Sequence, residues 1–350
     1  MKNLFKYMLL FIVVFSSCDA TIHEYPKEMS SEIILKFRVD NETMPHYKDV
    51  LYGYDGMVSR AANDNIYRRY IVEVYNTSRS NSYTNNNKVL RKEISKVVEK
   101  ELEYETLKLS LPVGKYNIVS WVDYSPKDDL QDWYYKASSL GEITEDRSVM
   151  LSRNDMKEAF SKNFYINVGR DNSNGEFYVL DEQGDKYSQQ ADANVVDFIV
   201  PRANAKLSLL ANDVEEYKTA GGNLENLRIK VRYTQFLSDS FSAFSQSPNK
   251  FIKEYTIVRP INENLLVNNK ELHLMSDFIL SSANKEDIVK IDISIYNKKD
   301  VLLNTYQDIE IPLYRTKETV VRGPFLTRKK EKGGVGIDNN FENEHTINID

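Results

Sequence analysis

The sequence predicts an all-β protein built from two antiparallel β-sandwiches in tandem. Apolar and polar residues alternate with a period of two in many short runs, the pattern of strands with one buried face. Tyr and Phe are frequent, at 23 and 15 residues, whereas Gly and Pro number only 13 and 9, and this composition favours strands over helices. A chain of 350 residues exceeds what one hydrophobic core usually holds, so two domains are expected.

The chain begins with the features of an export signal. Its first seven residues carry two lysines and no acidic residue, and eight apolar residues follow from Met8 to Phe15. This run is too short to span a bilayer. We therefore predict that residues 1–17 are a signal peptide. Residues 18–30 lack periodicity and are expected to form a tether to the first domain.

Cys18 is the only cysteine, so it cannot form a disulfide within the chain. It follows the apolar run and two serines, an arrangement that resembles the lipobox of bacterial lipoproteins. In those proteins the peptide is cut before the cysteine and the thiol is acylated, for example with palmitate. We expect lipidation of Cys18 and an anchor in the membrane. The alternative is an ordinary secretory signal with an incidental cysteine.

The first domain is predicted over residues 31–190. Its strand patterns lie at Ile33–Val39, Ile66–Tyr75, Leu107–Leu111 and Tyr116–Tyr124. The turn Pro112-Val113-Gly114 between the last two runs predicts a β-hairpin. Residues 88–100 fit the helix and strand templates equally poorly, so their type stays open. Asn154–Ser161 is expected to be a helical turn and residues 168–190 a loop.

The second domain is predicted over residues 191–350. Its strand patterns lie at Ala205–Ala211, Leu227–Tyr233, Val289–Ile295, Ile309–Ile311, Thr319–Leu326 and His345–Asp350. No long helical period interrupts them. Short strands at such spacings are typical of β-sandwiches.

Motifs for enzymatic chemistry are missing from the sequence. The four histidines lie outside metal-ligand spacing of one another and outside any nucleophile motif, and there is no phosphate-binding glycine loop. We expect no catalytic residues, no bound metal and no cofactor. The formal charge of −6 becomes about −8 once the signal peptide is removed, which disfavours nucleic acid as a partner.

One loop has some features of a calcium site. Asp171 to Gly175, with Glu182 eleven residues beyond Asp171, resembles a loop of alternating oxygen ligands closed by a bidentate glutamate. However, Glu176 occupies the sixth position, where the sharp turn needs glycine. We therefore favour a plain polar loop over a calcium site.

Aromatic residues cluster at Trp121 and at Trp133, Tyr134 and Tyr135. The last three are a candidate aromatic surface, because an indole face can stack on the apolar face of a sugar ring. Packing in the core or between sheets is the competing interpretation.

Two passages resemble the fimbrillin-like and fimbrial-anchor lipoproteins of Bacteroidales. They are LSLPVGKYNIVSWVDY, Leu109–Tyr124, and IPLYRTKETVVRGPFLTRKKEKGGVGIDNNFENEHTINI, Ile311–Ile349. The resemblance implies two transthyretin-like, Greek-key sandwiches, export to the outer membrane with surface exposure, and a role in building surface fibres. It also implies pairing with other fimbrial subunits through a donated strand. In related fimbrillins an arginine-directed protease cuts after the first strand, and Arg60 is the candidate for such a cut. An exposed arginine in a polar loop is the alternative.

These observations favour a non-enzymatic surface lipoprotein that is an anchor or accessory subunit in fimbria (pilus) assembly and adhesion. The alternative function is a surface lipoprotein that binds glycans through the neighbourhood of Trp133–Tyr135. Fold class alone does not distinguish them, because β-sandwiches host both functions.

Overall fold

The computed structural model describes most of the chain from Ser30 onward. The described residues are 30–40, 67–78, 87–97, 104–125, 130–147, 157–187, 194–225, 227–261, 266–267, 270–327, 335–338 and 344–349. The predicted signal peptide, Cys18 and Arg60 lie outside these residues.

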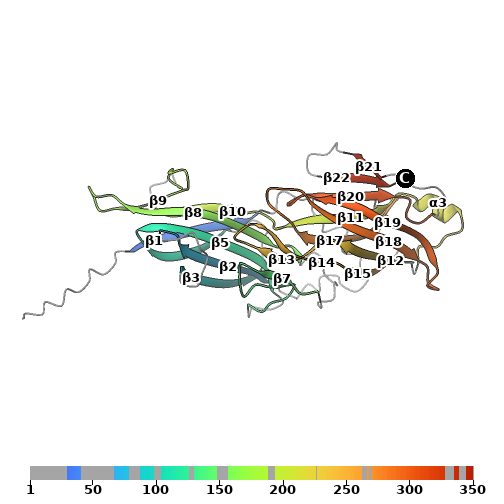
Figure 1. The fold of residues 1–350 in the computed structure, drawn as a ribbon, viewed down its shortest axis with the longest axis horizontal. Helices are drawn as coiled ribbons and strands as arrows, with labels where there is room; N and C mark the ends of the chain where they lie inside the picture. The colour runs from blue at the N-terminus through green and yellow to red at the C-terminus, as the bar shows by residue number, and fades with distance from the viewer. Residues whose placement is uncertain are drawn as a thin grey trace, which may run out of the picture.

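Two β-sandwiches follow one another along the long axis of the molecule (Figure 1). In the first, a three-stranded sheet in the order β10-β1-β4 faces a five-stranded sheet in the order β3-β2-β5-β8-β9. The bounds are β1 Ser30–Val39, β2 Tyr67–Asn76, β3 Lys88–Val97, β4 Glu105–Pro112, β5 Gly114–Ser125, β8 Phe160–Arg170, β9 Phe177–Leu180 and β10 Val195–Val200.

The second sandwich pairs a six-stranded sheet, β16-β17-β11-β20-β22-β21, with a four-stranded sheet, β15-β12-β18-β19. The bounds are β11 Asn204–Ala211, β12 Leu227–Gln235, β15 Tyr255–Ile261, β16 Leu266–Val267, β17 Glu271–Leu280, β18 Asp287–Tyr296, β19 Leu302–Leu313, β20 Glu318–Gly323, β21 Val335–Asp338 and β22 Glu344–Ile349. A short helix, α3 (Val214–Thr219), follows β11.

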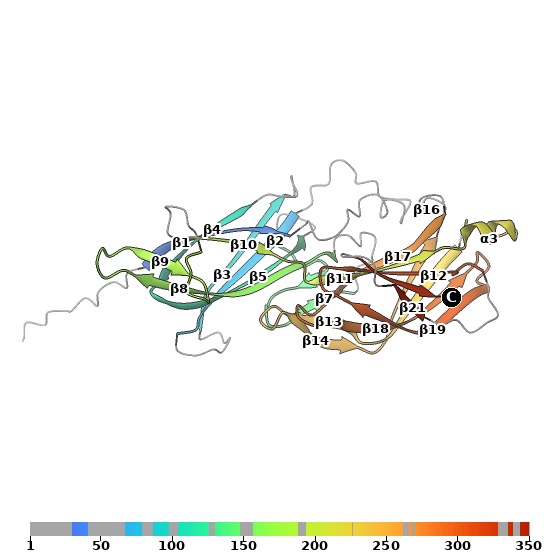
Figure 2. The same ribbon diagram turned by 90° about the horizontal axis from the view of Figure 1, so that it is seen from above.

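A further sheet joins the two sandwiches. Its order is β14-β13-β7-β6, with β6 Tyr135–Lys136 and β7 Ile143–Glu145 from the connection between β5 and β8, and β13 Leu237–Ser242 and β14 Ser247–Ile252 from the connection between β12 and β15. Strands β7 and β13 pair through Ile143 with Phe241 and through Thr144 with Ser240. The junction is therefore held by backbone hydrogen bonds as well as by side chains. Figure 2 shows β7, β13 and β14 between the strands of the two sandwiches.

The two sandwiches repeat one strand arrangement. In the first, β1 pairs antiparallel with β4 and parallel with β10; in the second, β11 pairs antiparallel with β17 and parallel with β20. Each sandwich thus places its first strand between an antiparallel and a parallel neighbour, and in the second sandwich the last strand, β22, lies beyond β20. The predicted all-β fold of two antiparallel sandwiches is confirmed; among the described strands, β1 with β10, β11 with β20 and β20 with β22 are parallel pairs and the other pairs are antiparallel.

The strand β10 belongs to the first sandwich, because it pairs with β1 from Ile34↔Val195 to Val39↔Val200. The predicted border after residue 190 assigned this strand to the second domain. We therefore propose that the border between the two domains lies after Val200, the last residue of β10.

Three clusters of buried side chains form the core. One fills the first sandwich, one fills the second, and a third lies at the junction and contains residues from both halves of the chain. The third cluster packs on the outer face of the sheet that holds β2 and β5. Both faces of these two central strands are consequently covered, and their burial is nearly continuous rather than alternating.

The predicted hairpin around Val113 is wrong, although both of its strands are present. Strand β4 pairs with β1, whereas β5 lies between β2 and β8 in the opposite sheet. The tight turn therefore carries the chain from one sheet to the other. Since both edges of β5 are already occupied by neighbouring strands, β5 has no edge left for β4.

Other local expectations also change. The undecided segment 88–100 contains a strand, β3. The helical turn predicted at 154–161 is wrong for its last two residues, because β8 starts at Phe160. The loop expected at 168–190 contains the end of β8 and a short strand, β9. In the second half, β13 to β17 were not foreseen, and all residues of β17 after Glu271 are buried.

We expect Leu109→Ala and Ile293→Ala each to reduce the free energy of unfolding by about 2 to 5 kcal/mol, because both side chains are buried in the core of their own sandwich. Denaturant unfolding measures the change. The exposed neighbour Lys108→Ala is the control and should unfold like the parent. Equal midpoints for all three variants and the parent would show that the two strand registers are wrong.

A second expectation concerns His273 on β17. Burial, aided by the charge of Lys206, lowers the pKa of His273 from 6.5 to about 3, and its Nε2 lies 2.7 Å from Ser276 Oγ. Between these two pH values the unfolded chain binds a proton that the folded chain does not. The free energy of unfolding should therefore fall by up to about 1.4 kcal/mol per pH unit as the pH decreases from 6.5 towards 3.

The change His273→Gln removes this titration. The difference in unfolding free energy between parent and variant should then depend on pH within that window, as measured by denaturant titrations at several pH values. Ser276→Ala is the matched control, because it alters the same contact without removing a titrating group. Parallel pH profiles for parent and His273→Gln would contradict the assignment.

Candidate functional site

Strand β1 is the central strand of the three-stranded sheet of the first sandwich. It lies between β10 and β4, and backbone hydrogen bonds at both ends, Ile34 N to Asn194 O and Asp40 N to Val200 O, each measure 2.9 Å. Along the chain, residues 40–66 separate β1 from β2, so β1 is joined to the next strand of the first sandwich by a long connection.

One face of β1 supplies a row of apolar side chains to the core. Ile33, Leu35, Phe37 and Val39 are buried, with 0 to 1% of their surface exposed. The ring of Phe37 stacks on Phe198 of β10 at 5.2 Å between centroids. The strand thus places an apolar side chain in the core at every second position, as the period of two requires.

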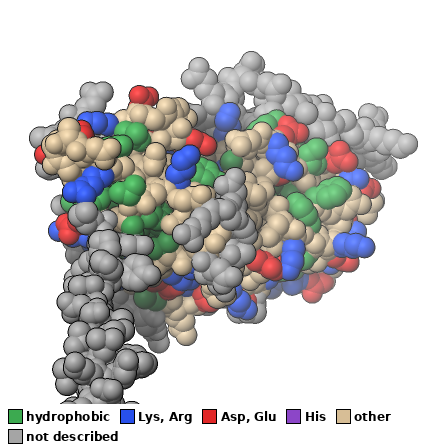
Figure 3. Space-filling view, turned by 60° about the vertical axis from the view of Figure 1, so that its left-hand side comes forward, with side chains coloured by type: hydrophobic (Ala, Val, Ile, Leu, Met, Phe, Trp, Pro, Cys, Tyr) green, Lys and Arg blue, Asp and Glu red, His purple; other side chains and the backbone are tan. Residues whose placement is uncertain are grey.

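The opposite face of β1 is partly exposed and carries charges. Lys36 lies 3.8 Å from Asp197 of β10, and Glu32 lies 3.1 Å from Lys108 of β4. These pairs are accessible to solvent, so each contributes little to stability. Figure 3 shows basic and acidic side chains interspersed among small hydrophobic patches over the described part of the surface in that view.

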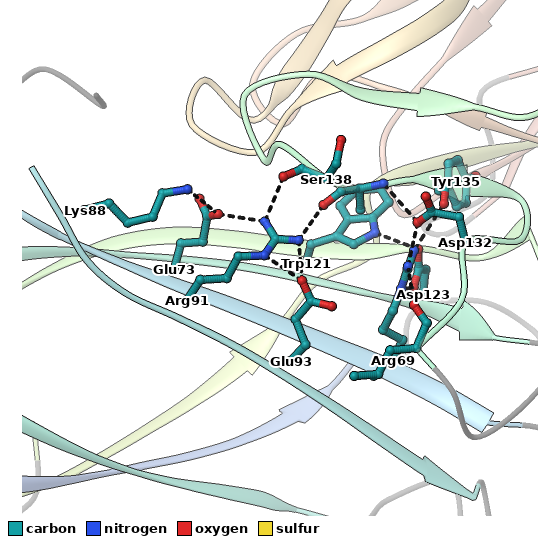
Figure 4. A network of polar contacts seen from close by, with 12 residues as sticks. Arg69, Glu73, Lys88, Arg91, Glu93, Trp121, Asp123, Asp132, Tyr135 and Ser138 are labelled. Carbon is teal, nitrogen blue, oxygen red and sulfur yellow. Dashed lines mark hydrogen bonds and ion pairs between the residues drawn. The ribbon is translucent and has the colours of Figure 1, made fainter. Parts of the chain in front are cut away.

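A polar network fixes the connection between β5 and β8 against the face of β2 and β5 (Figure 4). Arg69 binds Asp123 through two contacts of 2.8 and 2.6 Å and binds Asp132 at 2.6 Å. Trp121 Nε1 donates to the same Asp123 carboxylate at 2.9 Å. Burial alone would lower the pKa of Arg69, but the hydrogen bonds to the two carboxylates outweigh it and raise the pKa. The arginine therefore stays charged.

The second half of this network surrounds Glu73, whose side chain is fully buried. Lys88 and Arg91 bind Glu73 Oε1 at 2.8 and 2.7 Å, and Tyr75 donates to Oε2. Burial opposes ionisation, but these hydrogen bonds lower the pKa of Glu73 below its usual value. Arg91 also donates to the carbonyl of Ala137 at 2.7 Å, which ties β3 to the connection.

A buried cluster of charges lies deeper in the junction. Lys157 Nζ is 2.6 Å from Asp277 Oδ1 and 2.7 Å from Glu145 Oε1. Tyr233 donates to Asp277 Oδ2 at 2.9 Å, and Arg147 lies 3.0 Å from Glu145 Oε2. The side chains of Lys157 and Asp277 are each 1% exposed and that of Glu145 is 4% exposed. The two carboxylates outweigh the effect of burial and raise the pKa of Lys157.

Arg315, between β19 and β20, makes a further contact across the junction. It donates to the carbonyl of Ser161 at 2.7 Å and to Gln246 Oε1 at 2.8 Å, and it also binds the carbonyl of Arg202. Burial lowers the pKa of Arg315 to about 10. Charged side chains thus hold the junction from both sandwiches.

The candidate aromatic surface is not supported by the structure. Tyr134 and Tyr135 are 2% and 1% exposed and belong to the junction core, where the ring of Tyr135 packs edge-on against Trp121 at 5.4 Å. Trp133 is partly buried and packs against Tyr134 at 4.7 Å. The alternative interpretation of these residues, as core packing, describes them correctly.

The polar loop at Asp171 is the turn between β8 and β9. Asp171 Oδ1 accepts hydrogen bonds from Ser173 N at 2.7 Å and Ser173 Oγ at 2.6 Å, and Gly175 adopts a φ of +74°. Its side chains and backbone close the turn by themselves, as expected for a plain Asx turn. Among the described residues, no group of three or more His, Cys, Asp and Glu is placed to hold a metal ion.

The buried charges of the junction, Glu145, Lys157 and Asp277, were not predicted from the sequence. A signal was present in YRRYIVEVYN, where two arginines and a glutamate interrupt a strand that is buried on both faces. The partners of Lys157 lie 12 and 120 positions away along the chain, and no local pattern connects them. Only the fold brings them together.

Within the described part of the chain, no helix has the length and apolar character that crossing a bilayer requires.

The comparisons with known proteins place the chain in a family and return distant structural matches. A family model described as a family of unknown function (DUF6562) matches residues 32–350, and no curated protein matches the chain. One similar solved structure is a candidate adhesin from Bacteroides thetaiotaomicron, with 11% sequence identity, a TM-score of 0.40 and coverage of 79% of this chain and 80% of that chain. A second is the fimbrial anchor protein Mfa2 from Porphyromonas gingivalis, with 9% identity, a TM-score of 0.37 and coverage of 79% of this chain and 82% of that chain. A third is a candidate cell adhesion protein from Bacteroides eggerthii, with 10% identity, a TM-score of 0.38 and coverage of 92% of this chain and 98% of that chain.

Proposed function

The chain belongs to DUF6562, a family of unknown function, and we propose that it is a non-enzymatic surface lipoprotein that acts as an anchor or accessory subunit of a fimbria. The observation that carries the proposal is the position of β1, a separately connected central strand whose apolar side chains complete the first core. The export signal, Cys18 and the two passages that resemble fimbrial lipoproteins support it.

The proposed attachment is through lipid on Cys18 to the outer membrane. Residues 19–29 then separate the lipid from the start of β1 at Ser30. Several acyl chains on one cysteine give stable anchoring, whereas one chain is marginal at about 0.8 kcal/mol per buried CH₂. The sandwiches would stand on the membrane through the end of the molecule that carries β1.

We expect Cys18→Ala to release the protein from the membrane fraction or to leave it unprocessed, because acylation requires the thiol. Cell fractionation and labelling with a lipid precursor measure both outcomes. His23→Ala, in the predicted tether, is the control and should stay attached and labelled. Unchanged labelling and membrane association of Cys18→Ala would overturn the lipoprotein assignment.

The proposed partner is another fimbrial subunit that donates a strand. If β1 left its position, β4 and β10 would lose their shared neighbour and the sites of Ile33, Leu35 and Phe37 would be open to solvent. A donated strand with apolar residues at alternate positions would restore both the backbone hydrogen bonds and the core. Contacts of this head-to-tail kind build filaments.

Cleavage at Arg60 would conflict with an anchoring role. Cys18 and β1 lie on one side of Arg60 and the remainder of both sandwiches lies on the other. After a cut, only the noncovalent pairing of β1 would keep the body attached to the lipid. If the protein is an anchor, its chain must therefore stay intact at Arg60. If it instead assembles by exchange of β1, the chain must be cut there.

Digestion with an arginine-specific protease separates these versions. If Arg60 is cut and β1 exchanges, residues 61–350 should leave the membrane fraction and should then bind a labelled peptide with the sequence of Ser30–Val39. A matched peptide with Ser in place of Ile33, Leu35 and Phe37 is the control and should not bind. Arg60→Lys should block both effects. Retention of β1 and no peptide binding after cleavage at Arg60 would rule out exchange and leave the uncut anchor.

The alternative function, glycan binding, required an exposed aromatic surface at Trp133, Tyr134 and Tyr135. Tyr134 and Tyr135 are buried, so they cannot stack on a sugar ring. Among the residues that the structure describes, we identify no second aromatic platform for glycan binding.

A further inference from the structure

The charge cluster at Lys157 combines an amine, a carboxyl group and a second carboxylate in one buried site. Lys157 Nζ contacts Asp277 Oδ1 at 2.6 Å and Glu145 Oε1 at 2.7 Å, and all three side chains are at most 4% exposed. Lys157 precedes β8 of the first sandwich, and Asp277 lies on β17 of the second. A simple buried ion pair would need only Lys157 and Asp277, so the second carboxylate, Glu145, is available for another role.

We propose that Lys157 and Asp277 become joined by an intramolecular amide bond, with Glu145 as the proton carrier. The bond would link Nζ of Lys157 to Cγ of Asp277 and release one water molecule. It requires no oxidant, cofactor or second protein, because an ammonium group and a carboxylate contain all the atoms of an amide and water.

Burial makes the reaction feasible. The two carboxylates favour the charged form of Lys157, but burial disfavours every charge in the site and so reduces the free-energy cost of the neutral alternative. Transfer of one proton from the Lys157 ammonium to Asp277 Oδ1 gives that alternative, a neutral amine and a neutral acid. The amine is then a nucleophile, held in contact with the carboxyl group it attacks. The exclusion of water also favours the side of the equilibrium on which water is released.

The surrounding groups fit the later steps. The attack on Cγ produces a tetrahedral intermediate in which Oδ2 carries negative charge, and Tyr233 already donates to Oδ2 at 2.9 Å. The Glu145 carboxylate takes a proton from the attached nitrogen and gives it to Oδ1, which leaves as water. Oδ2 becomes the amide oxygen, and Glu145 returns to its starting state.

Glu145 is better placed as the proton carrier than as the acceptor of the new bond. Arg147 forms an ion pair with Glu145 Oε2 at 3.0 Å, and Glu145 Oε1, 2.7 Å from Lys157 Nζ, is the oxygen placed to take a proton. Asp277 Oδ2 instead accepts a hydrogen bond from the Tyr233 hydroxyl, which polarises the carboxyl group that the amine attacks. The Lys157 backbone is fixed by Tyr135, which donates to its carbonyl at 2.6 Å.

Such a bond would connect the two sandwiches covalently. Lys157 and Asp277 are 120 positions apart, and a chain with a single cysteine has no disulfide available for this purpose. A pull between the membrane end and the distal end would then be carried by an amide bond instead of by an ion pair.

Mass spectrometry of the purified full-length protein tests the proposal. Trypsin should fail to cut after Lys157, and the peptides Asn154–Lys162 and Glu271–Lys285 should appear as one branched product lighter than their sum by one water. In the variants Lys157→Arg and Glu145→Gln, trypsin should cut after residue 157, and Glu271–Lys285 should appear as a separate peptide without a branch. The buried pair Lys206 and Glu318, whose charged atoms lie 3.5 Å apart, is an internal control that should remain unlinked.

Two results would overturn the proposal. One is efficient cleavage after Lys157 in the parent protein, with an intact mass that shows no loss of water. The other is a branched product that joins Lys157 to the peptide Ala137–Arg147, which would place the bond on Glu145 instead of Asp277. Both are read from the parent protein, so neither depends on whether a variant folds.

Discussion

The burial of charged groups at the junction is the constraint on which the arrangement of the two sandwiches depends. Lys157 and Asp277 come from different sandwiches and are almost completely shielded from water. Buried charges of this kind contribute little net stability as a pair, but loss of one partner leaves an uncompensated charge that costs about 3 to 5 kcal/mol. The sandwiches are therefore held in the one relative position that keeps each charge paired.

The sheet that joins the two sandwiches, β14-β13-β7-β6, also fixes their relative position, in this case through backbone hydrogen bonds. Strands β7 and β13 come from connections within different sandwiches, so their hydrogen bonds form only when the sandwiches are correctly placed. The connection that carries β6 and β7 is in turn fixed by Arg69 and Arg91. Since Trp121 and Tyr135 pack in the same region, the residues that suggested a sugar-binding surface serve the junction instead.

The repeated strand arrangement connects this architecture with the proposed function. Each sandwich places its first strand between an antiparallel neighbour and a parallel neighbour. In the second sandwich the first strand, β11, follows β10 after only three residues, whereas β1 is connected to β2 through residues 40–66. The first sandwich is consequently the one whose first strand could be exchanged without separating the two sandwiches.

Period-two alternation predicted the strands with one buried face, such as β4, β12 and β18, because each residue there has a single environment. It failed for β17 and left β3 undecided, since a strand covered on both faces and a half-exposed edge strand both lose the alternation. The expected hairpin at Val113 failed for another reason. A tight turn looks the same whether the chain returns to its own sheet or crosses to the facing one, and pairing with β1 and β2 decides between them.

By itself, the sequence determined the all-β fold class, and it predicts an export signal and lipidation of Cys18, because these depend on local composition and on the order of residues along the chain. Only the tertiary structure decided which strands pair, that Tyr134 and Tyr135 are buried, and that Lys157 meets both Glu145 and Asp277. Those contacts join positions up to 120 residues apart. Their physical basis is the packing of two sandwiches against each other, for which a linear pattern of residue types contains no signal.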